Sequence, residues 1–233
     1  MTLLLAARGQ SHILLTADGR CMNTCRGVRA TTSDTLQKIF PVAGRPLAFV
    51  HHGENVINGQ SVSAIVDAIV QNNHDVISTA TLREISLLLG QDLNAEVTQT
   101  LTRIADSKTC GFWVCGFDPG ICKPQIYEVI WHKGSNSSIE LLIMPHGDLL
   151  MGGDAAQPIK NFLAEPIDAR LSWNRILTSD VQYSQELHDE LFRRAESAQT
   201  KNETDLFGGH KHRLVVTSDG CNWLLAPMIT RTE

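Results

Sequence analysis

The sequence lacks three features that would assign it to a broad functional class. It has no basic excess, since its 20 Lys and Arg are outnumbered by 25 Asp and Glu for a formal charge of −5. Nucleic-acid-binding domains carry a basic field, so this balance argues against a nucleic-acid partner. No apolar run approaches the roughly 20 residues that a membrane-spanning helix needs. The short apolar stretch from Leu3 to Ala7 meets Arg8 and Gly9, which does not fit a secretory leader. We expect a soluble, cytoplasmic protein with no membrane partner.

The cysteines lack the regular spacing of a disulfide framework. There are six of them: Cys21, Cys25, Cys110, Cys115, Cys122 and Cys221. Cys21 with Cys25, or Cys110 with Cys115, is an alternative metal pair, but neither has C-x-x-C spacing and no second pair matches. We favour free thiols in a reducing compartment, with no metal and no cofactor.

Alternating apolar residues and turn signals predict strands in three groups. Residues 2–7 and 12–17 form the first hairpin, and the loop-like segment 21–34 follows them. The other predicted strands are 35–40, 47–52, 111–117, 124–131 and 139–144, with a last hairpin of 213–218 and 222–226 around Asp219-Gly220.

Helical periodicity separates these groups of strands. Val62, Ile65, Val66, Ile69 and Val70 form the apolar stripe of an amphipathic helix. A second helical region spans 81–104 with a break or kink at Gly90, and further helices are predicted at 155–163 and 181–199. Without a repeat or linker, residues 1–233 are predicted to be one α+β domain with two sheets between two helical layers.

One predicted strand carries a lysine among apolar neighbours. In period two, Leu36, Lys38 and Phe40 share a face of the 35–40 segment. A buried lysine is costly unless it is paired, and Asp18 at the end of the second strand is a candidate partner. A lysine that extends to water and an ordinary Asp18-Gly19 turn are the alternative interpretations.

Several segments together resemble the proteasome β-subunit and HslV peptidase family of N-terminal-nucleophile hydrolases. They are T-L-L-L at residues 2–5, I-L-L-T-A-D-G-R at 13–20, Q-K-I-F at 37–40, L-A-F-V-H-H-G at 47–53, W-V-C-G-F-D at 113–118, P-Q-I-Y-E-V at 124–129 and D-L-F-G-G at 205–209. Within the family, the chain is most similar to bacterial proteasome homologues, with Anbu-type subunits as the second choice. The resemblance implies a four-layer αββα sandwich, the N-terminal-nucleophile hydrolase fold.

The resemblance also implies a threonine endopeptidase. Once Met1 is removed, the Thr2 hydroxyl would attack the substrate and its α-amine would accept the proton. Lys38, paired with Asp18, would favour the neutral amine and the developing alkoxide. The Gly53 N–H matches the family's oxyanion donor.

Other positions either match the family or depart from it. Asp205 matches a supporting aspartate, whereas Gly152 and Gly208 occupy places where the family usually has serines. The resemblance places Cys21, Leu36 and Val50 around the residue before the cut, which suggests small or medium apolar side chains there.

The two missing hydroxyls leave other functions open. One alternative is a weakly active or non-proteolytic proteasome-like scaffold or peptide-binding chamber, and another is a hydrolase of small amides. The resemblance implies stacked homo-oligomeric rings that take peptides or unfolded proteins, with a tetradecamer favoured over a dodecamer. It does not settle whether an ATPase partner exists. His51 and His52 should point to opposite faces of their strand, and His210 and His212 are expected on the surface.

Overall fold

The computed structural model describes residues 2–25, 28–103, 109–142, 149–153, 173–201 and 207–228. The chain is a mixed α+β protein with antiparallel sheets, as its sequence pattern predicts. It divides into two compact units, the first comprising Met1–Lys38, Met144–Val215 and Asn222–Glu233, and the second comprising Ile39–Ile143 and Val216–Cys221. Within the described ranges, every helix is too short or too polar to cross a bilayer.

A five-stranded sheet made mainly by the first unit contains both predicted hairpins. Its strand order is β12 (Leu149–Gly152), β1 (Leu4–Arg8), β2 (His12–Ala17), β13 (His212–Thr217) and β14 (Gly220–Leu225). The first hairpin is confirmed by the antiparallel register of β1 on β2, in which Leu4 faces Ala17. This register brings Asp18, the residue after β2, to the start of β1, where Thr2 and Leu3 lie.

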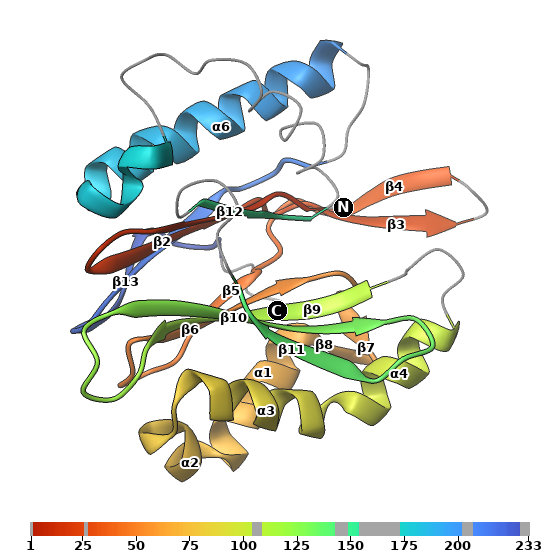
Figure 1. Ribbon diagram of the computed structural model, residues 1–233. Helices are drawn as coiled ribbons and strands as arrows, with labels where there is room; N and C mark the ends of the chain where they lie inside the picture. The colour runs from red at the N-terminus through yellow and green to blue at the C-terminus, as the bar shows by residue number, and fades with distance from the viewer. Residues whose placement is uncertain are drawn as a thin grey trace. The chain divides into compact units, whose positions relative to one another are not determined.

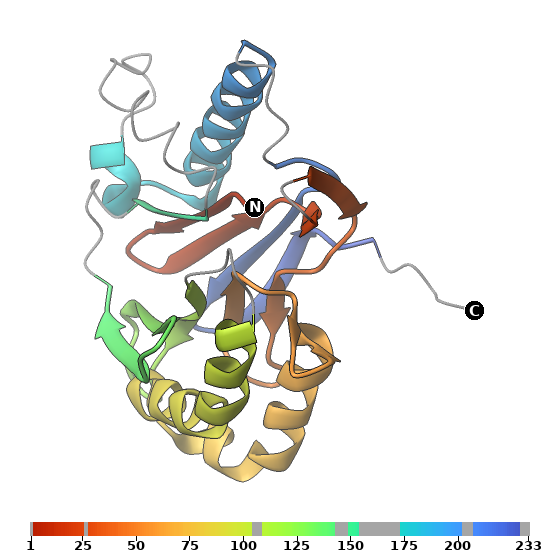
Figure 2. The same cartoon turned by 90° about the vertical axis from the view of Figure 1, so that its right-hand side faces the viewer.

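Helix α6 (Val181–Lys201) runs along one face of this sheet (Figures 1 and 2). Its predicted apolar stripe is confirmed, because Leu187, Leu191 and Phe192 are completely buried. They pack with Leu3 and Leu5 and with residues of the short 3₁₀ helix η1 (Trp173–Thr178) in one apolar cluster. The helix predicted at 155–163 lies outside the described residues.

Two predictions around Lys38 are wrong. Residues 21–34 form a second hairpin, β3 (Cys21–Cys25) and β4 (Val28–Ser33), rather than a loop. The polar composition of this segment predicts a loop, although its β-branched residues, such as Thr31 and Thr32, favour strands. The strand predicted at 35–40 is reduced to β5 (Ile39–Pro41), because the main chain before it bonds elsewhere: the Leu36 N–H donates to the Gly19 carbonyl at 2.8 Å.

The second unit has its own antiparallel sheet. The strand order is β11 (Ser137–Leu141), β10 (Pro124–His132), β9 (Thr109–Phe117), β6 (Leu47–His52) and β5. The short strands β7 (Val56–Ile57) and β8 (Gln60–Ser61) follow β6. The strands predicted at 47–52, 111–117 and 124–131 are thereby confirmed, with only small shifts of their ends.

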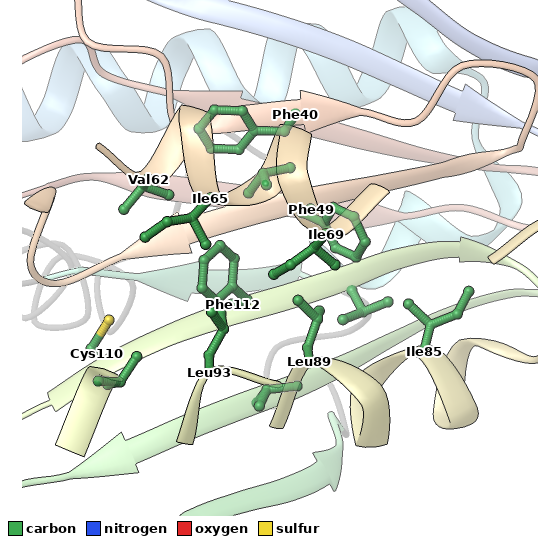
Figure 3. Close-up of a cluster of buried hydrophobic side chains, with 14 of the residues drawn as sticks. Phe40, Phe49, Val62, Ile65, Ile69, Ile85, Leu89, Leu93, Cys110 and Phe112 are labelled. Carbon is green, nitrogen blue, oxygen red and sulfur yellow. The ribbon is translucent and has the colours of Figure 1, made fainter. Parts of the chain in front are cut away.

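The helices of this unit are α1 (Val62–Asn72), α2 (His74–Thr79), α3 (Leu82–Asp92) and α4 (Asn94–Arg103). Side chains from α1 and α3 pack against strand residues such as Phe49 and Phe112 to form its apolar core (Figure 3). The predicted break in the helical region is confirmed, but it lies at Leu93, between α3 and α4, and not at Gly90. A Cβ at Gly90 would lie 3.1 Å from Ser137 Oγ, so glycine instead allows β11 to approach the helix.

Candidate active site

The centre of the candidate site is the carboxylate of Asp18, which is completely buried. Its Oδ1 accepts hydrogen bonds from the Leu3 N–H and from Lys38 Nζ, both at 2.8 Å. Its Oδ2 accepts the N–H groups of Gly208 at 3.1 Å and Arg20 at 3.3 Å. A carboxylate has about four acceptor positions, so these four donors fill its capacity and fix its orientation.

The predicted ion pair between Lys38 and Asp18 is confirmed. The Lys38 side chain is 2% exposed, and its Nζ donates to Asp18 Oδ1 and to the Arg20 carbonyl, each at 2.8 Å. Burial lowers the pKa of Lys38, while the Asp18 carboxylate acts in the opposite direction. A charged pair this deep in a protein is expensive to desolvate, so its retention is informative about function.

Thr2 is buried two residues before β1 begins. The next residue, Leu3, contacts Asp18 of this pair through its main chain. The Leu3 N–H donates to Asp18, and the Asp18 N–H donates back to the Leu3 carbonyl at 3.2 Å. Gly153, with φ +86°, lies against Thr2: a Cβ there would collide with the Thr2 carbonyl oxygen and lie 3.2 Å from Thr2 Cβ. Only glycine therefore permits this approach of the β12 end to the first residue.

Gly208 reaches Asp18 because α6 holds the residue before it. Gln199 brackets Phe207, accepting its N–H at 2.8 Å and donating to its carbonyl at 3.1 Å. A Cβ on Gly208 would lie 3.1–3.3 Å from the Arg20 guanidinium, so a serine here would crowd that side chain. Gly152, the other position where the resemblance predicts a serine, pairs with Leu4 in the sheet. Asp205 lies outside the described residues.

His212 is a site residue that the sequence analysis missed. Its expected surface position is wrong: the side chain is 1% exposed, and its Nε2 accepts the Lys38 main-chain N–H at 3.0 Å. Burial, followed by the charge of Lys38, lowers the pKa of His212 to about 3, so the ring is neutral. The available signal was the apolar run Leu214–Val216 directly after His212, since every residue from His212 to Val216 is buried in β13.

Two predicted substrate-binding residues lie in the first unit beside this pair. Cys21 begins β3 and is half-buried. Leu36 is also half-buried, with its main chain attached to Gly19. Whether these side chains contact a substrate remains a prediction.

The other two predicted residues, Val50 and Gly53, lie in the second unit. Val50 is 1% exposed in β6. Gly53 follows the end of that strand with φ +99°, and a Cβ there would lie 2.7 Å from the Thr109 carbonyl oxygen and 2.8 Å from Cys110 Cα. The positive φ and the lack of space both require glycine at this position.

The two histidines before Gly53 point to opposite faces of β6, as predicted. His51 is buried, with Nε2 3.6 Å from Cys110 Sγ, whereas His52 Nε2 lies 3.2 Å from a carboxylate oxygen of Glu128. Burial raises the pKa of the Cys110 thiol to about 12, so it is not an activated nucleophile.

The described side chains include no group of three or more His, Cys, Asp and Glu residues arranged to hold a metal ion. Cys110 and Cys115 are five residues apart in β9, so they point to opposite faces of the sheet.

No protein-family model matches the chain, and a comparison with curated proteins finds no match either. The features of the chain that bear on its function are therefore its sequence motifs and the geometry around Asp18 and Lys38.

Proposed function

We propose that the chain is the subunit of a threonine-type peptidase, in which Thr2 becomes the amino terminus and the nucleophile after removal of Met1. The observation that carries this proposal is the buried Asp18–Lys38 pair, because Asp18 Oδ1 also holds the Leu3 N–H next to Thr2. Replacing such a pair by apolar residues is often neutral or stabilising, so stability alone does not explain it. A buried charge pair beside a potential nucleophile favours a chemical role.

The proposed reaction begins with attack of Thr2 Oγ on the substrate carbonyl carbon. The α-amine of Thr2, with an ordinary pKa of about 7.7–8.0, takes the hydroxyl proton directly or through a water molecule. The amine then returns that proton to the leaving amine of the substrate, and an ester on Thr2 remains. Water hydrolyses this ester and restores the hydroxyl.

In this scheme, Lys38 acts by its charge. An ammonium group beside the α-amine disfavours the protonated amine and stabilises the developing alkoxide. Asp18 orients Lys38, and the Gly53 N–H is the proposed donor to the oxyanion. Cys21, Leu36 and Val50 are the proposed contacts for a small or medium apolar substrate residue.

We further propose the four-layer αββα arrangement and a cytoplasmic assembly of stacked homo-oligomeric rings around the active sites. The αββα arrangement is supported by the two antiparallel sheets, each of which has helical residues packed on it. An enclosed chamber would restrict cleavage to peptides and unfolded proteins that enter it.

The geometry at Gly208 favours one alternative, a proteasome-like scaffold or peptide-binding chamber with little or no peptidase activity. The serine hydroxyl is absent at Gly208, and a Cβ there would lie 3.1–3.3 Å from the Arg20 guanidinium, which would have to shift slightly. With fewer polar groups around it, the α-amine of Thr2 would have a pKa and an orientation less suited to a general base.

Labelling and activity of Thr2 variants distinguish the two proposals. Intact mass spectrometry should show that Met1 is absent, and a peptide epoxyketone or boronate should modify Thr2. Against a panel of fluorogenic peptides, Thr2→Ala should abolish cleavage, Thr2→Ser should retain part of it, and the exposed-surface control Thr31→Ala should match wild type. Retained Met1, or a Thr2→Ala variant as active as wild type, would contradict the peptidase proposal. Processed but inert protein would favour the scaffold.

A further inference from the structure

Two kinds of contact hold Lys38. Its side chain pairs with Asp18, and its main-chain N–H contacts His212. Residues 35–38 lie outside any strand, and the Leu36 N–H donates to the Gly19 carbonyl at 2.8 Å. The Lys38 main-chain N–H donates to His212 Nε2 at 3.0 Å, across 174 residues of sequence. A buried N–H without a partner is costly, so this acceptor contributes to the position of the segment.

The surroundings of His212 fix which ring nitrogen accepts. The ring is 1% exposed and packs edge-on near Trp223, with 6.3 Å between ring centroids. A neutral imidazole has one donor and one acceptor nitrogen. Since Nε2 accepts from the Lys38 N–H at 3.0 Å, the proton of the neutral ring is on Nδ1.

We propose that His212 is a positioning residue for Lys38: its neutral ring joins the β13 end to the Lys38 main chain and thereby sets where Nζ lies. The inference rests on the peptidase proposal and adds a supporting residue to it. His212 acts through Lys38 and does not contact the substrate.

The segment before β13 supports the same group of residues. The Gly208 N–H donates to Asp18 at 3.1 Å, and the His210 N–H donates to the Asp34 carbonyl at 2.7 Å. Together with the His212 contact, these bonds attach residues 208–212 to both members of the ion pair. The support therefore comes from main-chain donors and one imidazole.

The ring remains an acceptor across the working pH range. Burial and the nearby Lys38 charge keep the pKa of His212 near 3, and the charge of His210 acts in the same direction. Among the described residues, Lys38 and His210 are the charged groups that act on the pKa of this ring. Its role is consequently geometric and does not depend on its titration.

The decisive comparison is between His212→Leu, which removes the acceptor, and His212→Gln, whose amide oxygen can replace Nε2. We expect His212→Leu to lower kcat about tenfold, the ratio that follows from losing about 1.4 kcal/mol of transition-state stabilisation. KM should stay within about twofold of wild type, because His212 does not contact the substrate and ground-state binding of the substrate is unchanged. His212→Gln should recover most of kcat. Equal kcat in the Leu and Gln variants would overturn the proposal. His74→Gln, which changes an exposed histidine outside this group, is the matched control and should match wild type.

A second measurement does not depend on peptidase activity. Brief acetic anhydride treatment followed by peptide mass spectrometry gives the acetylation rate of Lys38 in the folded protein. That rate should rise severalfold in His212→Leu and stay near wild type in His212→Gln. If wild type cleaves no peptide, the proposed function fails while this rate still tests His212. If peptides are cleaved but Lys38 reacts equally in all three proteins, the role of His212 is refuted.

Discussion

At the scale of single residues, the two members of the buried pair are not equally dependent on each other. Asp18 accepts three main-chain N–H groups besides Lys38. Without Asp18, Lys38 Nζ would retain only the Arg20 carbonyl among the partners found. The lysine is thus the member that would be left poorly compensated.

This asymmetry predicts different costs for the two substitutions. Asp18→Asn leaves a buried charge without its counter-ion and should destabilise the protein by about 3–5 kcal/mol. Lys38→Met leaves a carboxylate that still has three donors, and it should cost clearly less. Urea unfolding midpoints of both variants and wild type measure this difference. A Lys38→Met variant as unstable as Asp18→Asn would contradict the explanation.

At the scale of elements, α6 contacts β2 and β13 through a buried polar network. Arg213 donates from Nε to Thr16 Oγ1 at 3.0 Å, and Thr16 Oγ1 lies 2.8 Å from His188 Nδ1. Within the described part of the chain, His188 Nε2 has no hydrogen-bond partner. Arg213 also pairs with Asp189 of α6 at 2.5 Å.

This network makes the stability of the first unit sensitive to acid. Burial, then the charges of Arg213 and His12, lowers the pKa of His188 well below 6.5. Burial also lowers the pKa of His12, opposed by Asp180. As the pH falls below about 6.5, these histidines are protonated in the unfolded chain before they are protonated in the folded chain. The free energy of unfolding therefore decreases as the pH falls.

For His188, this loss should approach about 1.4 kcal/mol per pH unit below pH 6.5. His188→Asn keeps a polar atom near the Nδ1 position but cannot be protonated in this range. It should flatten the pH dependence of the urea midpoint between pH 7.5 and 5. His74→Asn, which changes an exposed histidine, should keep the wild-type slope. The same slope in both variants would exclude His188 as the source.

At the scale of the whole molecule, apolar side chains remain exposed in each unit. Leu224, Leu225 and Met228 are 43–53% exposed in and after β14, which ends one sheet, and Leu141 is 49% exposed in β11, which ends the other. Exposed apolar residues on edge strands are typical of surfaces that are covered in an assembly.

Sedimentation velocity tests the proposed assembly directly. We expect a species near fourteen times the chain mass, consistent with two stacked seven-membered rings, and the Thr2→Ala variant should sediment identically because catalysis is not needed for assembly. A twelve-fold mass would favour six-membered rings. Sedimentation at the chain mass would contradict the compartment.

Local patterns determined much of the fold and part of the site. Helical spacing of apolar residues predicted α1 and α6, and two-residue alternation predicted the β1–β2 hairpin. These signals suffice because one face of each element must be buried. The pairing of Asp18 with Lys38 was also predictable, since a lysine within an apolar pattern requires a counter-ion nearby.

Tertiary structure alone decided the remaining support. Gly208 and His212 reach Asp18 and Lys38 across 190 and 174 residues, and no local periodicity indicates such contacts. Gly153 and Gly208 have positive φ and lie against Thr2 and Arg20, so their lack of a side chain has a cause that only the fold reveals. The sequence determined which residues carry the proposed chemistry, whereas folding determined what holds them, because hydrogen-bond partners are selected by proximity in space.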